Sequence, residues 1–359
     1  MPGMRVWILT EDFPPKRGGL SRWAWNTAST LAGLDHEVVV LSKRAVPREG
    51  TVPAPVSVDG RSFYALRHIY FARAVRRLLR SSCRPDLILA STWRTAEGVL
   101  LALPGCPVHT AAHGLEVFTR CTPLLRLRRR LVLQRSSIVL AASRFTAARV
   151  VRVAPAARIR VGINGVDTDL FTPDGEARPA EHGIQLLSVG RLIPRKRFDL
   201  VIEAVAAIRA AGLDAGAWIV GSGPQEAKLR RLAESAGPAV RFLGEVADGE
   251  LAGLYRGSDL FLSPCMSDPA SGDVEGFGLT FLEASACGTA VAGLAEGGVT
   301  DAVEDGVSGI LTTRDDFVSR VVELCMSRDS LERMGRLGRE RASGLFDLRR
   351  VVPGMVEVP

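Results

Sequence analysis

Short apolar runs alternate with helical patterns in both halves of this chain, and this alternation is the feature that most constrains its fold. In the first half, the apolar runs Val6–Leu9, Leu87–Ala90 and Val108–Ala112 are interspersed with helical patterns at Ala24–Leu31, His68–Arg80 and Leu124–Arg135. Continuous apolar runs of this length are typical of strands that are buried on both faces of a parallel sheet. The sequence therefore predicts an α/β protein with Rossmann-like, doubly wound parallel sheets.

The alternation stops and restarts near the middle of the chain, which indicates two domains. At 359 residues the chain exceeds what one core usually organises. A polar segment with Pro and Gly precedes the next strand pattern at Gln185–Val189. We predict a first domain at residues 1–172, a linker at 173–183, a second domain at 184–342, and a tail at 343–359 that returns toward the first domain. The carboxyl edges of the two sheets are expected to face each other across a cleft.

The composition is that of a globular protein with excess positive charge. Hydrophobic residues make up 47% of the chain and charged residues 24%, which argues against extensive disorder. Because no apolar run reaches the roughly 18 residues that span a bilayer and no signal-peptide pattern is present, we expect a cytoplasmic protein. The net charge of +7 fits a nucleic acid, an anionic membrane, a phosphorylated substrate or simply a solvated surface. The six cysteines lack metal-ligand spacing, so we expect reduced thiols and no metal site.

Two glutamates in the second half enclose a Gly-Phe-Gly segment. Glu275 precedes residues 276–279, and Glu283 lies in the helical pattern that follows. If the helix begins near Gly278, the N–H groups of its first turn form an anion site that suits a phosphate. The two carboxylates on either side of it suit a pyrophosphate that carries sugars at both ends. The alternative is a Gly-containing loop before an ordinary helix with Glu283 on a solvated face.

Other candidate ligand-binding residues follow predicted strands, where open α/β sheets bind their ligands. His113 comes after Val108–Ala112, and it is either a ligand-binding or a hydrogen-bonded structural histidine. Arg191 and Lys196 follow Gln185–Val189, where their charges would offset those of a diphosphate, although such a pair alone is more often surface. Glycines that allow close approach to the backbone recur in the same kind of loop, at Gly18, Gly19, Gly190, Gly221 and Gly223.

Two arginine-rich segments have the pattern of basic amphipathic helices. They span His68–Arg80 and Leu124–Arg135, where arginines alternate with Ala and Leu. Such helices dock on anionic lipid headgroups, or form a solvated face. The sequence leaves both interpretations open.

Together, these motifs resemble the retaining glycosyltransferases of family GT4, which have the GT-B fold. The matching segments follow the family order through most of the chain: Gly18-Gly19, His113-Gly114, Asn164–Asp167 with Phe171, Gly190–Leu192 with Lys196, Gly221–Pro224, Phe242–Gly244, Asp259 with Pro264, and Glu275–Leu279 with Glu283. Within the family, Asp273–Gly278 and His113–Glu116 are similar to the bacterial mannosyltransferases that build phosphatidylinositol mannosides.

The resemblance implies a hexosyltransferase with acceptor binding in the first domain and nucleotide-sugar binding in the second. Its donor would be GDP-mannose or a UDP- or dTDP-hexose, its acceptor a lipid headgroup, a cyclitol or another small hydroxylated molecule, and it would need no cofactor, metal ion or nucleic acid. Glu275 would bind donor-sugar hydroxyls, Glu283 the ribose, and His113 the sugar near the reacting carbon. The catalytic residues would be His113, Glu275, Arg191 and Lys196, and the donor-binding residues Gly18, Gly19, Gly190, Gly221, Gly223, Gly276, Phe277, Gly278, Leu279 and Glu283.

The chain departs from the family where Arg197 follows Lys196 in place of the usual glycine, and we expect this side chain to lie near the phosphates. A sugar-nucleotide epimerase on the same fold is one alternative, although it would need further acid/base carboxylates in the first domain. A basic module that binds a membrane or nucleic acid without turnover is another. A nicotinamide enzyme is disfavoured, because the loop at Gly18 lacks the G-x-G-x-x-G pattern.

Overall fold

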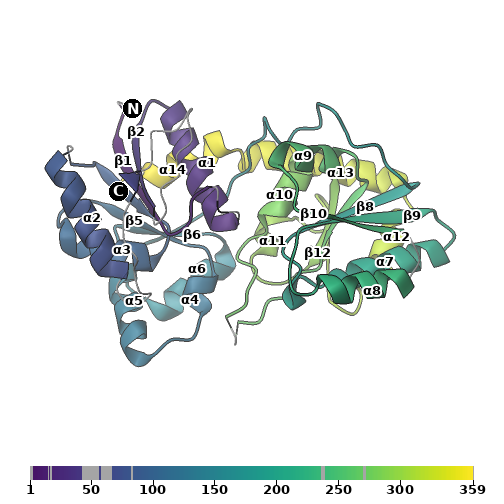
Figure 1. The fold of residues 1–359 in the computed structure, drawn as a ribbon, viewed down its shortest axis with the longest axis horizontal. Coiled ribbons are helices and arrows are strands. Elements are labelled where there is room, and N and C mark those ends of the chain that lie inside the picture. The colour runs from purple at the N-terminus through teal and green to yellow at the C-terminus, as the bar shows by residue number, and fades with distance from the viewer. Residues whose placement is uncertain are drawn as a thin grey trace. The chain divides into compact units, whose positions relative to one another are not determined.

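The computed structural model describes residues 3–14, 16, 18–42, 56–57, 67–81, 84–235, 239–269 and 272–358. They divide into two compact units (Figure 1). Unit 1 comprises residues 1–164, 269–272 and 348–359, and unit 2 comprises residues 165–268 and 273–347. Residues 165–183, which the sequence analysis divided between the first domain and the linker, group with unit 2, whereas the end of the predicted tail groups with unit 1.

Unit 1 is built on a parallel sheet with the strand order β3-β2-β1-β4-β5-β6-β7. Its strands are β1 (Arg5–Thr10), β2 (Glu37–Ser42), β3 (Val56–Ser57), β4 (Leu87–Ala90), β5 (Val108–Ala112), β6 (Ile138–Ala141) and β7 (Ile159–Val161). Its helices are α1 (Gly19–Gly33), α2 (Arg67–Ser81), α3 (Trp93–Ala102), α4 (Leu115–Phe118), α5 (Pro123–Arg135), α6 (Arg144–Val153) and α14 (Leu348–Val356). Helices α2, α3 and α5 pack together on one face, and α1 packs with α14 on the other (Figure 1).

Unit 2 repeats this architecture with the strand order β10-β9-β8-β11-β12-β13. Its strands are β8 (Ile184–Val189), β9 (Ala215–Val220), β10 (Val240–Gly244), β11 (Leu260–Ser263), β12 (Ala290–Leu294) and β13 (Ile310–Thr312). Its helices are the 3-10 turn η2 (Pro194–Lys196), α7 (Phe198–Ala210), α8 (Glu226–Ser235), α9 (Asp248–Arg256), α10 (Leu279–Ala286), α11 (Val299–Ala302), α12 (Phe317–Cys325) and α13 (Arg328–Leu345). Helices α7, α8 and α12 cover one face of the sheet, and α9, α10 and α13 the other (Figure 1).

The prediction of two doubly wound parallel sheets is confirmed in both units. The continuous apolar runs become strands that are buried along their whole length, as at Leu87–Ala90 and Leu260–Ser263. Because β1 lies between β2 and β4, and β8 between β9 and β11, the direction of winding reverses beside β1 and beside β8. At such switch points the loops after the strands diverge, and open α/β sheets bind ligands there.

Two further sequence-based expectations concern membrane spans and cysteines. None of the described helices is both long and apolar enough to cross a membrane. Cys106, Cys121, Cys265, Cys287 and Cys325 are free thiols, and Cys83 lies outside the described residues.

Candidate active site

The predicted helix start after the Gly-Phe-Gly segment is confirmed in unit 2. Helix α10 begins at Leu279, and Gly278 is its N-cap residue with φ 95°. A Cβ atom on Gly278 would lie 2.7 Å from the Phe281 ring. Both this close contact and the positive φ favour glycine at this position. None of the described side chains caps the helix, and the N–H groups of a first turn have no partner inside their own helix. This end of α10 has the properties of an anion-binding site.

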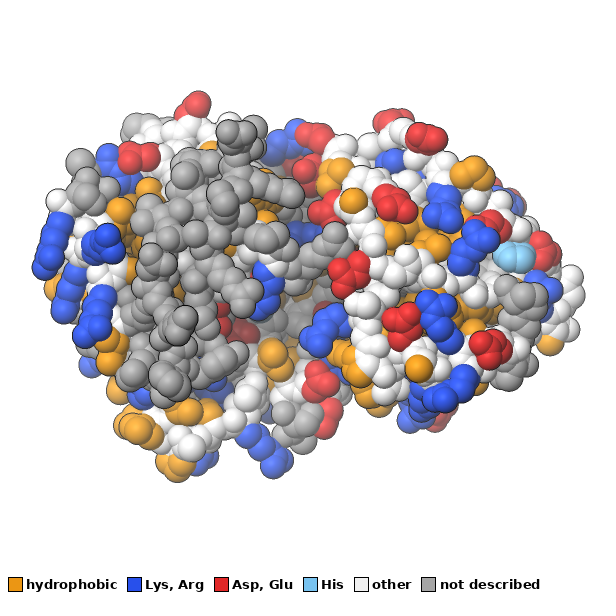
Figure 2. All heavy atoms as spheres, viewed as in Figure 1, with side chains coloured by type: hydrophobic (Ala, Val, Ile, Leu, Met, Phe, Trp, Pro, Cys, Tyr) orange, Lys and Arg blue, Asp and Glu red, His pale blue; other side chains and the backbone are white. Residues whose placement is uncertain are grey.

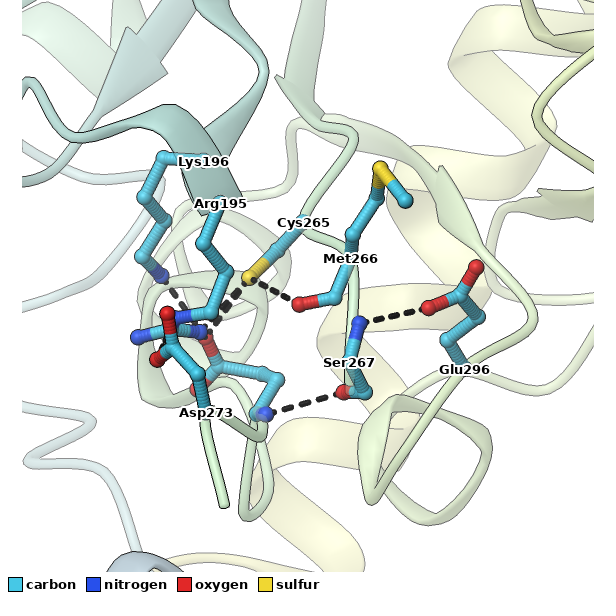
Figure 3. Close-up of polar contacts among 8 residues, drawn as sticks. Arg195, Lys196, Cys265, Met266, Ser267, Asp273 and Glu296 are labelled. Carbon is cyan, nitrogen blue, oxygen red and sulfur yellow. Dashed lines mark hydrogen bonds and ion pairs between the residues drawn. The ribbon is translucent and has the colours of Figure 1, made fainter. Parts of the chain in front are cut away.

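Glu275 lies just before this helix, and three donors hold one of its two oxygens. Figure 3 labels these donors, Lys196, Arg195 and Cys265. Its Oε2 atom accepts hydrogen bonds from Lys196 Nζ at 2.7 Å, from Arg195 Nη1 at 3.0 Å and from Cys265 Sγ at 3.2 Å. The Glu275 side chain is 16% exposed. None of the described residues donates a hydrogen bond to the other oxygen, Oε1. The carboxylate is therefore oriented by its own protein on one side only.

The electrostatics of this cluster keep Glu275 ionised. Burial alone would raise the pKa of Glu275, but Lys196 and Arg195 outweigh it and lower the pKa to about 2. Burial likewise opposes the charge on Lys196, and Glu275 outweighs it and raises the Lys196 pKa. Burial raises the pKa of the Cys265 thiol to about 12, so the proton stays on sulfur. The Glu275 carboxylate thus lies between two cations and a neutral thiol, and the Asp273 carboxylate forms a further ion pair with Arg195 at 2.8 Å.

Hydrogen bonds also hold the backbone of Glu275 in place. Its N–H donates to Ser267 Oγ at 2.9 Å, and its carbonyl accepts from Gly298 N at 2.9 Å. The Ser267 N–H in turn donates to a Glu296 carboxylate oxygen (Figure 3). A Cβ atom on Gly297 would lie 2.4 Å from the Glu275 carbonyl oxygen, so a glycine is required for this close approach.

Arg191 and Lys196 are the two cations that were predicted for this site, and only one of them contacts Glu275. Lys196 contacts it directly, whereas Arg191 is exposed and forms no ion pair with the described residues. The Arg197 guanidinium binds the Asp199 carboxylate at 2.7–3.0 Å and not Glu275, and its position near the phosphates stays a prediction. Arg197 has φ 48°, and this left-handed backbone separates η2 from α7. Arg195, which the sequence analysis missed, occupies the second cationic position beside Glu275.

Close backbone packing between two loops explains why several of the predicted donor-binding positions of unit 2 are glycines. Gly221 and Gly223 follow β9, where added Cβ atoms would lie 2.0 Å from the Gly190 carbonyl oxygen and 2.6 Å from that of Leu192. Gly190 itself has φ 154°. These glycines allow the loops after β8 and β9 to pack backbone against backbone. Their contact with a donor stays a prediction.

Glu283 lies in α10 and is 3% exposed, so the alternative of a solvated face is wrong. Its Oε2 atom accepts a hydrogen bond from the buried Tyr255 hydroxyl at 3.0 Å. This bond fixes one carboxylate oxygen inside unit 2. The predicted contact with a ribose stays a prediction.

The predicted site residues of unit 1 lie at the carboxyl ends of β1 and β5. His113 directly follows β5, and its ring packs edge-on against Trp23 at a centroid distance of 5.0 Å. Its backbone N–H donates to Glu116 Oε1 at 2.6 Å. Burial lowers the pKa of the His113 imidazole to about 4, and its Nε2 atom has no hydrogen-bond partner among the described residues. Gly18, with φ 140°, and Gly19 start α1, and Cβ atoms there would meet nothing within 4 Å. Unit 1 thus contains a neutral imidazole after β5, and two glycines with free space around them at the start of α1.

Comparison with known proteins identifies the family. Residues 17–170 match the family described as Glycosyltransferase Family 4, and residues 175–341 match Glycosyl transferases group 1. A GDP-mannose-dependent alpha-(1-6)-phosphatidylinositol monomannoside mannosyltransferase from Mycobacterium tuberculosis is 31% identical over 94% of this chain and 93% of its own length. The chain belongs to glycosyltransferase family 4. It is a hexosyltransferase, and the predicted resemblance to the mannosyltransferases of phosphatidylinositol mannoside synthesis is confirmed.

Solved structures agree with this assignment at the level of the fold. Sucrose-phosphate synthase from Thermosynechococcus elongatus has a TM-score of 0.78 at 20% identity and covers 98% of this glycosyltransferase and 97% of its own chain. Anabaena HepE in complex with UDP has a TM-score of 0.78 at 19% identity, with 98% of both chains covered. The predicted GT-B fold is therefore confirmed for this family 4 glycosyltransferase.

Proposed function

We propose that this glycosyltransferase transfers a mannosyl group from GDP-mannose to a hydroxyl group of a phosphatidylinositol monomannoside, with retention of configuration and without a metal ion. The donor and acceptor are those named for the 31% identical relative from Mycobacterium tuberculosis. The observation that carries the proposal is the Glu275 carboxylate, which three donors hold through Oε2 beside the uncapped start of α10. This geometry supports binding of a sugar next to a diphosphate.

In this proposal the two Glu275 oxygens have different tasks. Oε2 stays with the cationic cluster, and Oε1 accepts hydrogen bonds from hydroxyl groups of the mannose. A carboxylate accepts hydrogen bonds from sugar hydroxyls well, because its bonds are charge-assisted. The low pKa of Glu275 keeps it an acceptor throughout the physiological range.

The diphosphate binds at the start of α10 in this proposal. N–H groups at Phe277, Gly278 and Leu279 donate to the distal phosphate, and Lys196 and Arg195 supply positive charge nearby. The bond between the anomeric carbon and the phosphate oxygen breaks, and its electron pair leaves with GDP. Preoriented N–H dipoles and cations stabilise the charge that develops on this oxygen.

The acceptor hydroxyl then bonds to the anomeric carbon on the face that GDP has left. Its proton passes to the departing phosphate oxygen, so no protein side chain is needed as a base. We assign His113 to the donor sugar, where its neutral imidazole accepts a hydroxyl hydrogen bond at Nε2. The lowered pKa of His113 supports this role, because an imidazolium would have no lone pair to accept with.

A lipid acceptor requires contact with a membrane, and we propose that α2 and α5 provide it. Figure 2 shows a row of Lys and Arg side chains on the side of unit 1 where α2 lies. The exposed arginines on α2 are Arg73, Arg76, Arg77 and Arg80. Exposed residues on α5 include Arg126, Arg130 and Arg135 and the three leucines Leu124, Leu127 and Leu131. Arginines attract anionic headgroups, and exposed leucines between them suit the apolar part of the interface.

The proposal is tested by product analysis. The protein is incubated with GDP-mannose and vesicles that contain phosphatidylinositol monomannoside, with EDTA present throughout, and lipids are measured by mass spectrometry. We expect one added hexose and release of GDP, with lower rates for UDP- and dTDP-hexoses. D-inositol 3-phosphate serves as a competing acceptor, because a D-inositol 3-phosphate glycosyltransferase is 35% identical over 54% of this chain. Transfer to that compound alone, or conversion of the sugar nucleotide without an acceptor, would contradict the proposal.

A further inference from the structure

Cys265 occupies a buried position inside the charged cluster around Glu275. It follows β11 and Pro264, and it is fully buried. Its Sγ atom lies 2.8 Å from Arg195 Nη1 and 3.2 Å from Glu275 Oε2 (Figure 3). A buried cysteine normally packs as a small apolar residue. Here the sulfur lies between a guanidinium and a carboxylate.

The directions of these two hydrogen bonds follow from their chemistry. Guanidinium groups only donate, so the sulfur accepts from Arg195. An ionised carboxylate only accepts, so the S–H group donates to Glu275. The carbonyl oxygen of Met266, at 3.6 Å, is a more distant and uncharged competitor for the same proton. The thiol therefore links Arg195 to Glu275 as acceptor and donor at once.

We propose that Cys265 is a positioning residue for Glu275, in that its thiol holds Oε2 and so aims Oε1 at the donor sugar. This inference rests on the proposed function, because it assigns Glu275 to the sugar. Lys196 has a long, rotatable side chain that could follow a displaced carboxylate, and the Arg195 guanidinium is shared with Asp273, whose Oδ1 atom lies 2.8 Å from its Nε atom. Cys265 has a single side-chain torsion and sits on a buried segment after β11, so it fixes where Oε2 lies.

This role predicts a specific kinetic pattern. Loss of the thiol hydrogen bond loosens Glu275 around the sugar, so catalysis suffers while the diphosphate site is retained. For Cys265→Ala we expect kcat with GDP-mannose to fall about tenfold, as for one modest hydrogen bond to a charged group. Binding of GDP, which has no sugar, should change less than twofold. For Cys265→Ser, whose hydroxyl both donates and accepts, most of the activity should return.

The experiment compares these variants with Cys325→Ala as a matched control. Cys325 is also a buried thiol of unit 2, but it is the last residue of α12 and belongs to the hydrophobic core. We expect Cys325→Ala to keep the kcat of the wild type. The inference is overturned if Cys265→Ala keeps full kcat, if Cys265→Ser is as impaired as Cys265→Ala, or if GDP binding falls in parallel with kcat.

A spectroscopic measurement separates this inference from the proposed function. The S–H stretching band of Cys265, assigned by its loss in Cys265→Ser, reports hydrogen bonding of the thiol without any turnover. We expect this band at lower wavenumber in the wild type than in Glu275→Leu, which removes the acceptor. If the wild type transfers no mannose but the band shifts, the proposed function fails and the thiol contact stands. A band that does not respond to Glu275→Leu would refute the contact itself.

Discussion

Replacing Glu275 with glutamine removes the negative charge that Lys196 and Arg195 share. Their nitrogens lie 2.7 and 3.0 Å from Oε2. Burial opposes ionisation of Glu275, but the two cations outweigh it and lower the pKa from 4.5 to about 2. Lowering the pKa of Glu275 from 4.5 to about 2 corresponds to about 3 kcal/mol of folding free energy at pH 7.

The sign of this contribution fixes its pH window. Because the folded-state pKa of Glu275 is lower than the unfolded value of 4.5, the stabilisation is present above pH 4.5 and is lost as the pH falls through about 2. Urea denaturation at pH 7 should therefore show a free energy of unfolding about 2–3 kcal/mol lower for Glu275→Gln than for the wild type. This difference should shrink toward pH 3. Glu332→Gln is the control, since that exposed carboxylate, paired with Arg328, should contribute under about 0.5 kcal/mol.

The same substitution should strengthen the binding of GDP. In the ligand-free protein Glu275 and Asp273 together offset the charges of Lys196 and Arg195, so a diphosphate has to compete with Glu275. Glutamine removes the competitor, and we expect GDP to bind about tenfold more tightly by calorimetry, which is about 1.4 kcal/mol. Mannose transfer should fall by roughly two orders of magnitude or more, because the sugar loses a charged acceptor. Unchanged stability together with weaker GDP binding would refute this reasoning.

Three further changes test other parts of the site. Because burial lowers the His113 pKa from 6.5 to about 4, wild-type stability should be full above pH 6.5 and fall as the pH drops toward 4, and urea denaturation of His113→Asn should show a smaller fall. Gly278→Ala should cost about 1–3 kcal/mol of unfolding free energy, because φ is 95° and the new Cβ would meet the Phe281 ring, and weaker GDP binding should accompany it. Replacing Leu124 and Leu127, which are 65% and 53% exposed, with serine should lower flotation with anionic vesicles about tenfold or more while transfer to a water-soluble acceptor is kept. Equal flotation of this variant and the wild type would count against membrane docking through α5.

The fold was largely predictable from the sequence because buried parallel strands are continuous apolar runs. Leu87–Ala90 and Val108–Ala112 became β4 and β5 with the predicted bounds. Strand β9 begins at Ala215, and its first three residues give no strand signal in the sequence, because Ala and Gly carry no strand preference of their own. The short strand β7 (Ile159–Val161) was not singled out as a strand, since its residues are only partly buried and give no apolar run.

The features of the candidate site that depend on backbone geometry were predictable from the sequence, whereas the directions of its side chains were not. Glycine before a helical pattern correctly located the start of α10. The run Pro194–Arg197 contains three adjacent cations, and only the fold shows that Arg195 turns to Glu275 while Arg197 turns to Asp199. Cys265 gave no signal beyond that of a packed thiol, because its partners are ten and seventy residues away in sequence.

The most direct test of the central claim is a crystal structure with a GDP-mannose analogue that carries fluorine at the sugar 2-position and turns over slowly. The account predicts a mannose hydroxyl within hydrogen-bond distance of Glu275 Oε1 and a distal phosphate on the N–H groups of Gly278 and Leu279. Well-defined nucleotide density at another place, with Glu275 Oε1 turned away from the sugar, would contradict it.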